Sequence, residues 1–141
     1  MKVVLAGGSG LIGRALCGAL VAAGHEPVVL TREPRETSRL PAGVRAVAWG
    51  PPEVGDWAAE LADAGAVINL AGESIGRWPW TPGRKRALLE SRRQATGALV
   101  DAVGRLPAGR RPAVLLSASG TDLYEGRDAE PAAESTLPGA P

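Results

Sequence analysis

Three glycines near the start of the chain, Gly7, Gly10 and Gly13, follow a short apolar run and open a helical pattern. The run at residues 3–6 is continuously apolar, which is typical of a parallel strand buried on both faces. In a dinucleotide-binding turn the first glycine permits a tight turn, the second lets the backbone approach the pyrophosphate, and the third allows close helix packing on the strand. The free N–H groups and the positive end of the helix dipole complete an anion site. The residues expected to hold the dinucleotide in this segment are Gly7, Gly10, Leu11, Ile12 and Gly13.

Two other interpretations of the glycine segment compete with dinucleotide binding. One is a glycine turn that only packs a helix against a sheet. The other is a Walker A phosphate loop, which fits less well because no Gly-Lys-Ser/Thr sequence follows and Arg14 stands where the chain enters the helix. The strand before the glycines and the helical periodicity after them favour the dinucleotide.

Length and composition set the outer limits. A chain of 141 residues forms one domain, which is small for an enzyme that also needs a substrate domain. Its 16 basic residues nearly balance 15 acidic ones, so the composition indicates no binding of nucleic acid or of an anionic membrane. The single cysteine, Cys17, excludes an internal disulfide and fits a reducing cytoplasm, and no apolar run is long enough to span a membrane. We assign no metal site.

Strand-like and helix-like patterns alternate along the chain. Short apolar runs predict strands at residues 3–6, 27–30, 44–49, 66–70 and 113–117. Helices are expected at residues 11–23, 56–64 (with Asp56 as the N-cap) and 84–103, and a loop at 33–43. Strands separated by helices require crossover connections, so the fold class is α/β, a Rossmann-type parallel sheet of about five strands with helices on both faces. Residues 1–126 are expected to form this domain, and residues 127–141 a poorly ordered tail.

The end of the second strand indicates which cofactor the site takes. A site for NAD usually has an Asp or Glu here for the ribose 2′-hydroxyl, whereas an arginine accommodates the 2′-phosphate of NADP. The strand ends in Thr31 and Arg32, which offer a hydroxyl and an always charged guanidinium suited to phosphate. Glu33 favours NAD instead, unless it faces solvent or pairs with Arg35. Thr31 and Arg32 together favour NADP(H).

A basic side chain, Arg92, falls within the apolar face of the long helical pattern. At 100° per residue this face carries Leu88, Ala95, Leu99 and Val103. A guanidinium on the side toward the sheet needs a partner. Two alternatives stay open. Either Arg92 reaches the helix edge or pairs with an acid such as Glu90, or it points at the bound cofactor from below the fourth strand.

Several short motifs along the chain resemble those of one protein family. They are residues 6–13, 24–26, 30–32, 67–73, 77–78, 91–92 with Thr96, 116–119, Tyr124 and 134–135. Together they cover nearly the whole chain and resemble the epimerase family proteins, an atypical branch of the extended short-chain dehydrogenases/reductases that binds NADP(H). The Asn-Leu-Ala-Gly-Glu sequence at 69–73 and the Ser-Arg pair at 91–92 are quite specific to this branch. The resemblance implies that NADP is contacted by Thr31, Arg32, Leu70, Ala71 and Arg92.

The chain also departs from this family. Extended members carry a catalytic serine after the fifth strand, which Ser119 matches, and a Tyr-x-x-x-Lys motif on the next helix. No such motif exists here, because the only tyrosine, Tyr124, is followed four residues later by Asp128. Around Tyr124 the family usually reads Gly-Tyr-Tyr-Gly, whereas this chain places Asp122 and Glu125 where the nicotinamide pocket is expected. We therefore assign no catalytic residue.

Three functions are compatible with these observations. The first is the NADP(H)-binding domain of an epimerase/dehydratase-like oxidoreductase, truncated on its C-terminal side before the remaining strands and the substrate domain, and not catalytic on its own. The second is a non-catalytic nucleotide sensor or interaction module. The third is a fragment without function, whose open sheet edge promotes self-association. The expected ligands are thus a dinucleotide and a small-molecule substrate that the sequence does not identify.

Overall fold

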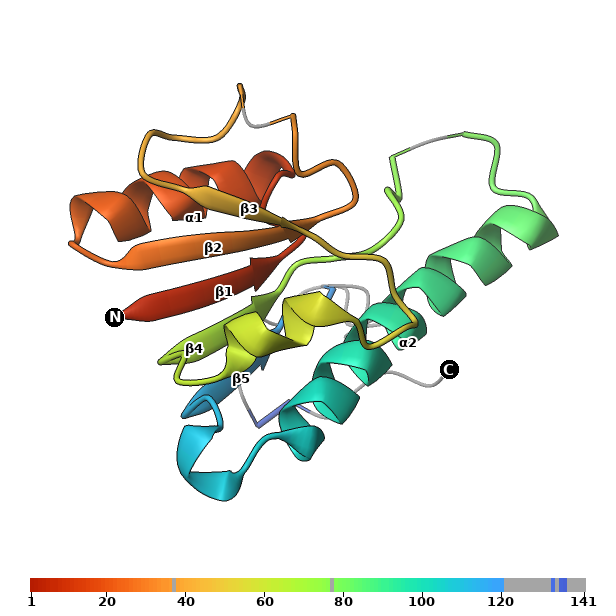
Figure 1. The fold of residues 1–141 in the computed structure, drawn as a ribbon. Coiled ribbons are helices and arrows are strands. Elements are labelled where there is room, and N and C mark those ends of the chain that lie inside the picture. The colour runs from red at the N-terminus through yellow and green to blue at the C-terminus, as the bar shows by residue number, and fades with distance from the viewer. Residues whose placement is uncertain (37, 77, 121–132, 134, 137–141) are drawn as a thin grey trace.

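The computed structural model describes residues 1–36, 38–76, 78–120, 133 and 135–136. Within them, five parallel strands form one sheet in the order β3-β2-β1-β4-β5 (Figure 1). The strands are β1 (Lys2–Ala6), β2 (Glu26–Thr31), β3 (Arg45–Ala48), β4 (Ala66–Asn69) and β5 (Val114–Ser117). The helices are α1 (Leu11–Ala22) and α2 (Pro82–Arg105), with the short 3₁₀ helices η1 (Asp56–Leu61) and η2 (Ala108–Arg110). The expected Rossmann-type parallel sheet is confirmed.

β1 lies at the centre of the sheet because its apolar run pairs on both sides. Val4 stands opposite Val28 of β2 on one side and opposite Val67 of β4 on the other. The chain runs outward from β1 through β2 to β3, then returns to β4 and continues to β5, so the winding reverses between β1 and β4. In open parallel sheets, ligands bind outside the carboxyl ends of the strands at such a reversal. The glycine turn after β1 lies at this position.

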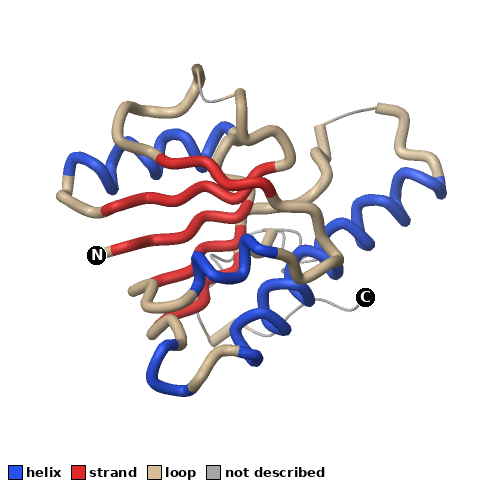
Figure 2. Tube along the Cα trace, in the orientation of Figure 1, coloured by secondary structure: helices blue, strands red, loops and turns tan. Residues whose placement is uncertain are grey.

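Helices cover both faces of the sheet, as Figure 2 shows. α1 packs on one face, where its Cys17 joins Leu5 and Val29 of the strands in one apolar cluster. α2 and η1 lie on the other face, where Leu99 and Trp57 belong to a second cluster. The residues of β1 alternate between the two clusters because successive side chains of a strand point to opposite faces. Burial on both faces explains why the strand runs are continuously apolar.

α2 begins at Pro82, two residues before the start predicted at residue 84. Thr81 caps the helix, since its side chain accepts a hydrogen bond of 3.2 Å from the backbone N–H of Arg84, and proline is favoured at the first helical position. The buried face of the helix carries Leu88, Ala95, Ala98, Leu99 and Ala102. The orientation of this buried face determines which side chains of α2 lie near the carboxyl ends of the strands.

The short helix expected at residues 56–64 is the 3₁₀ helix η1, which ends earlier, at Leu61. The expected N-cap, Asp56, is instead its first residue, and no side chain caps it. Just beyond the helix, Asp63 has a φ of +60°, so the backbone has left the helical region. Without a cap, η1 is held by its buried side chains Trp57 and Leu61.

β5 is an edge strand whose apolar side chains contact solvent. Val114, Leu115 and Leu116 are 46%, 39% and 53% exposed. No strand among the described residues pairs with its outer side. The self-association expected at an open sheet edge would use β5, and it stays a prediction. The expected boundary between residues 126 and 127 lies outside the described residues.

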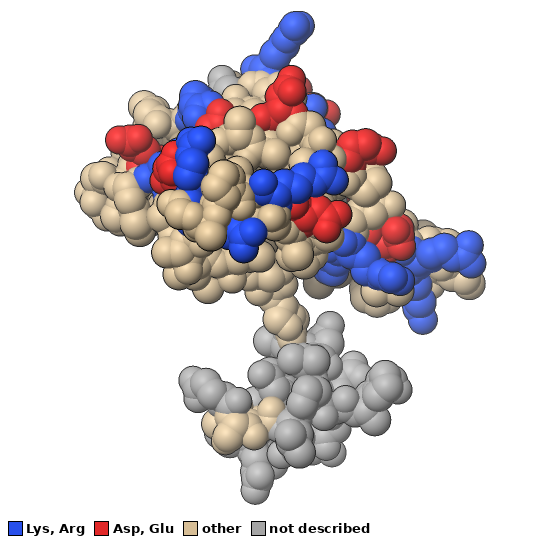
Figure 3. All heavy atoms as spheres, turned by 60° about the horizontal axis from the view of Figure 1, so that its bottom comes forward, with Lys and Arg blue, Asp and Glu red and all other residues tan. Residues whose placement is uncertain are grey.

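Charges of both signs are interspersed over much of the face shown in Figure 3. Basic side chains gather at the protruding end formed by the first turns of α2, where Arg84, Lys85 and Arg86 follow one another. The described residues hold no group of three or more His, Cys, Asp or Glu side chains placed to bind a metal ion. They also include no helix long and apolar enough to cross a membrane.

Candidate dinucleotide site

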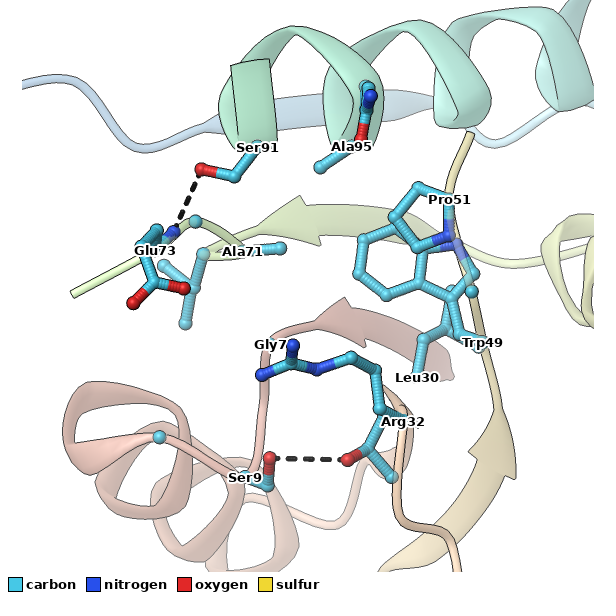
Figure 4. A pocket seen from close by; sticks show the side chains of 16 residues that line it. Gly7, Ser9, Leu30, Arg32, Trp49, Pro51, Ala71, Glu73, Ser91 and Ala95 are labelled. Carbon is cyan, nitrogen blue, oxygen red and sulfur yellow. Dashed lines mark hydrogen bonds between the residues drawn. The ribbon is translucent and has the colours of Figure 1, made fainter. Parts of the chain in front are cut away.

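A hollow of about 410 Å³ opens at the carboxyl ends of β1, β2 and β4 (Figure 4). We call it the first hollow. Its lining consists of Gly7, Ser9, Gly10, Leu30, Thr31, Arg32, Trp49, Gly50, Pro51, Leu70, Ala71, Gly72, Glu73, Ser91, Gln94 and Ala95. The predicted binding residues in this lining are Gly7, Gly10, Thr31, Arg32, Leu70 and Ala71. The sheet reversal thus brings together segments that are far apart in the sequence.

Gly7 turns the chain sharply after β1. Its φ is +76°, and a Cβ added there would lie 2.9 Å from the Cα of Ala71, so a larger residue would collide with the turn after β4. Gly10 closes the glycine turn by donating a hydrogen bond of 3.1 Å to the carbonyl of Gly7. Gly13 is buried, and a Cβ there would lie 2.5 Å from the Cα of Gly8. Gly13 therefore lets α1 pack closely on the glycine turn, whereas packing on the strand was expected.

Leu11 and Ile12, also predicted to bind the dinucleotide, turn their side chains to solvent, with 81% and 68% exposed. Neither side chain lines the first hollow. As the first residues of α1, they and Gly13 have backbone N–H groups without an acceptor inside the helix. What these residues can offer an anion is therefore their amides, at the positive end of the helix dipole.

Two guanidinium groups and two hydroxyl groups lie near the end of β2. Ser9 Oγ is 3.4 Å from Thr31 Oγ1, and Arg14 donates a hydrogen bond of 3.1 Å to the Ser9 carbonyl. Arg32 extends over the hollow (Figure 4), and its guanidinium makes no hydrogen bond or ion pair with any described residue. A free guanidinium beside hydroxyl groups fits a phosphate monoester. Arg14 is not among the predicted binding residues, although its position in the first turn of α1 indicates that it could contact a bound phosphate.

Glu33, the residue that favoured NAD, does not line the first hollow. Its side chain is exposed, and it forms no ion pair with Arg35. Its backbone N–H donates a hydrogen bond of 3.3 Å to Thr31 Oγ1, which helps to hold the threonine hydroxyl in place. At the end of β2 the chain therefore presents Arg32 to the hollow, and not Glu33.

Asn69, to which no role was assigned from the sequence, is the one buried polar side chain among the described residues, with 4% exposed. Its Nδ2 donates hydrogen bonds to Thr96 Oγ1 of α2 at 3.1 Å and to Ser117 Oγ of β5 at 3.3 Å. Its Oδ1 accepts one of 3.1 Å from the N–H of Ala71. A buried polar group left without a partner costs about 1 to 3 kcal/mol, so these bonds hold the turn after β4 in one place. The available signal was a lone polar residue within an apolar strand.

Ser91 and Arg92 join α2 to the same turn. Ser91 Oγ accepts a hydrogen bond of 2.9 Å from the N–H of Glu73 and donates one of 3.0 Å to the Leu88 carbonyl. Arg92 donates to the carbonyls of Leu88 and Glu73, at 3.0 and 3.4 Å. A Cβ on Gly72 would lie only 3.2 Å from the Arg92 Cζ. The Ser-Arg pair and the Asn-Leu-Ala-Gly-Glu sequence are thus parts of one contact.

Arg92 lies outside the first hollow and lines a second one, which shares residues 70–72 with it. The pairing of Arg92 with Glu90 is wrong, because Glu90 accepts a hydrogen bond of 3.1 Å from Gln94 instead. A contact between Arg92 and a cofactor would come from the side of this second hollow.

Of the residues expected around the nicotinamide, only Ser119 is described. Ser119, which matches the family's catalytic serine, lines the second hollow. Tyr124, Asp122 and Glu125 lie outside the described residues.

The residues of the first hollow fit a dinucleotide. The glycine turn offers space that a Cβ would fill, and the start of α1 offers amides for a diphosphate. Arg32 supplies a positive charge that no described residue neutralises. Leu30 and Ala71 provide apolar surface between these polar parts.

Comparison with known proteins agrees with this geometry. Residues 3–141 match the family model of the NAD dependent epimerase/dehydratase family. An epimerase family protein of Staphylococcus saprophyticus is 33% identical over 122 residues, which cover 86% of this chain and 38% of that protein. One of Mycobacterium bovis is 37% identical over 123 residues, which cover 86% and 37%.

The structure is similar to the crystal structure of a human epimerase family protein with NADPH. The TM-score is 0.78 at 28% identity, and the match covers 98% of this chain and 43% of that chain. A UDP-glucuronic acid 4-epimerase of Bacillus cereus, in complex with UDP-glucuronic acid and NAD, shares the fold with a TM-score of 0.76 at 21% identity. This chain spans less than half the length of the proteins it matches.

Proposed function

Since this chain belongs to the NAD dependent epimerase/dehydratase family, we propose that it is the NADP(H)-binding domain of an epimerase/dehydratase-like short-chain dehydrogenase/reductase and is not catalytic on its own. The observation that carries the proposal is the guanidinium of Arg32 over the first hollow, beside the glycine turn, where no described residue pairs with it. The similar human protein crystallised with NADPH supports the choice of the phosphorylated cofactor.

Each part of the cofactor has residues of this chain suited to it. The pyrophosphate would lie on the amides of residues 11–13. The 2′-phosphate would meet Arg32 and the hydroxyl of Thr31. The backbone of residues 70–71 would border the cofactor where it crosses the ends of β1 and β4, and Arg92 would approach it from the second hollow.

The cofactor, when bound, supplies hydride transfer, and the residues of this chain bind and orient it. The reacting partner would be a small molecule. We place the domain in the cytoplasm, because its one cysteine, Cys17, is buried in the core and forms no disulfide.

The first prediction concerns the choice of cofactor. We expect the purified chain to bind NADPH more tightly than NADH, because charge-assisted hydrogen bonds from Arg32 to the 2′-phosphate contribute about 1.5 to 3 kcal/mol. Arg32→Ala should narrow this preference about tenfold or more. Binding is measured by energy transfer from the four tryptophans to the reduced nicotinamide.

Arg39→Ala is the matched control, because Arg39 is also an exposed arginine between β2 and β3 but does not line the first hollow. It should leave both affinities unchanged. Equal affinities of the unmodified chain for NADPH and NADH would contradict the assignment of NADP. If the chain binds neither NADPH nor NADH, the whole proposal is wrong.

A further inference from the structure

The second hollow, of about 620 Å³, lies on the other side of the turn after β4. This turn, the first turns of α2 and the end of β5 with Ser119 enclose it. The side chains that decide its chemistry are Ile75, Trp80, Lys85, Leu88, Leu89 and Arg92.

Cations line the second hollow, and no carboxylate of a described residue does. The side-chain ammonium group of Lys85 makes no hydrogen bond or ion pair with any described residue. Arg92 donates to two carbonyl groups, which are neutral, and it forms no ion pair with a described residue. The acidic side chain of the same turn, Glu73, lines the first hollow and pairs with Arg84 at 3.6 Å. Together with the basic end of α2 (Figure 3), the two cations favour an anionic ligand.

Large apolar side chains of the second hollow face solvent. Ile75, Trp80 and Leu89 are 56%, 45% and 59% exposed. The indole N–H of Trp80 donates a hydrogen bond of 3.2 Å to the Ile75 carbonyl, so its polar atom is already satisfied and its ring is held in place. Leu88, with 8% exposed, extends this apolar surface inward. Covering such a surface with a carbon skeleton contributes about 25 cal/mol per Å².

We propose that the second hollow binds an amphipathic organic anion. Its apolar body would lie on Trp80 and Leu89, and its carboxylate or similar group would meet Lys85. The inference rests on the proposed function, because the hollow shares residues 70–72 with the first and includes Ser119, so the ligand would lie beside the bound cofactor as the substrate. A neutral, strongly polar substrate would leave both the apolar surface and the cations unused.

Two aromatic probes separate the contribution of the charge from that of the apolar surface. The first, 1-anilinonaphthalene-8-sulfonate, is an anion, and N-phenyl-1-naphthylamine has the same ring system without the sulfonate. Both become fluorescent on apolar protein surfaces, so both are titrated onto the whole chain, without NADP⁺ and with saturating NADP⁺. We expect the sulfonate probe to stay bound when NADP⁺ is present, because the two hollows lie on opposite sides of one turn.

Lys85→Gln should weaken binding of the sulfonate probe roughly fivefold and leave the neutral probe unchanged, and Lys85→Arg should restore the affinity. Arg93→Gln is the matched control, because Arg93 is an exposed cation of α2 that does not line the hollow. Leu89→Ser should weaken the binding of both probes. Val100→Ser should weaken neither, because Val100 is a 50% exposed residue of α2 away from the hollow.

Three results would overturn the inference: equal affinity of the sulfonate probe for Lys85→Gln and the unmodified chain, displacement of the probe by NADP⁺, or no effect of Leu89→Ser. NADPH titration of the same variants separates the two proposals. If NADPH binds but the probe shows no dependence on Lys85, only the inference fails. If NADPH does not bind at all, the proposed function fails.

Discussion

Gly10 is the residue at which the binding role of the glycine turn is best tested. Its backbone is ordinary, with φ −72° and ψ 178°, and a Cβ added there would contact only the Gly7 carbonyl, at 3.3 Å. Gly10→Val is therefore compatible with the fold, but it places a branched side chain where pyrophosphate must approach the backbone. We expect the affinity for NADPH to fall about tenfold or more. The free energy of unfolding should fall by only about 1 kcal/mol, because valine is a poor helix cap.

Gly97→Val is the matched control, since Gly97 lies on α2 and a Cβ there meets nothing within 4 Å. It should leave the affinity for NADPH intact, as measured by the same energy transfer. An unchanged affinity in Gly10→Val would mean that the glycine turn only packs α1 against the sheet.

Residue roles could be predicted where the backbone itself requires a residue type. The positive φ of Gly7 belongs to a turn whose glycine spacing is visible in eight consecutive residues. Asn69 instead bonds to residues 27 and 48 positions away, so its role depends on contacts that exist only after folding. The same holds for Arg92, whose helix face was predictable while its acceptors, two backbone carbonyls, were not.

At the scale of the element, apolar runs predicted each described strand to within one residue at either end. Buried parallel strands are continuously apolar, and polar or glycine residues interrupt the run where the strand ends. The form and the end of η1 could not be predicted, because burial of Trp57 and Leu61 stabilises it, and not a cap. The start of α2 was within reach of sequence reasoning, since Thr81 followed by Pro82 is typical of a helix start.

An ion pair links two elements, β3 and η1. Arg45 donates hydrogen bonds of 2.7 and 2.5 Å to the Glu60 carboxylate, which lowers the pKa of Glu60 from its ordinary 4.5. A carboxylate with a lowered pKa in the folded state stabilises the fold above its ordinary pKa, and this contribution is lost as the pH falls through the lowered pKa. Glu60→Gln should therefore cost a few tenths to about 1 kcal/mol at neutral pH, since the pair is partly exposed.

Urea unfolding of the unmodified chain and of Glu60→Gln, measured from neutral to acid pH, checks this prediction. The difference in the free energy of unfolding between the two proteins should disappear as the pH falls below the lowered pKa of Glu60. Glu36→Gln changes an exposed carboxylate without an ion-pair partner among the described residues. Its free energy of unfolding should equal that of the unmodified chain at every pH. If Glu60→Gln stays less stable than the unmodified chain in acid, then packing of the Glu60 side chain, and not its charge, stabilises the fold.

At the scale of the whole molecule, the fold class could be predicted because strands alternating with helices leave few other arrangements. The two hollows could not be predicted from the sequence, because their walls come from segments that meet only when the sheet has formed. The first hollow alone joins residues from Gly7 to Ala95. Everything that the proposal assigns to cofactor binding therefore lies within one continuous part of the chain.

Turnover requires a proton donor as well as a bound cofactor. A reductase requires a proton donor within hydrogen-bond reach of the substrate carbonyl and a pocket that excludes water. The sequence has no Tyr-x-x-x-Lys motif, and Asp122 and Glu125 flank its only tyrosine, Tyr124. We therefore expect the chain to bind NADPH without oxidising it in the presence of a substrate.

The test supplies NADPH together with a panel of aldehydes, ketones, quinones and nucleotide sugars, and follows the absorbance of the reduced cofactor. The control is a double variant, Ser119→Ala with Tyr124→Phe, whose affinity for NADPH should match that of the unmodified chain, because Ser119 does not line the first hollow and Tyr124→Phe removes only a hydroxyl group. We expect no substrate-dependent oxidation by either protein. Oxidation by the unmodified chain that the double variant abolishes would contradict the prediction, because it would make Ser119 and Tyr124 a working catalytic pair despite the absence of the lysine.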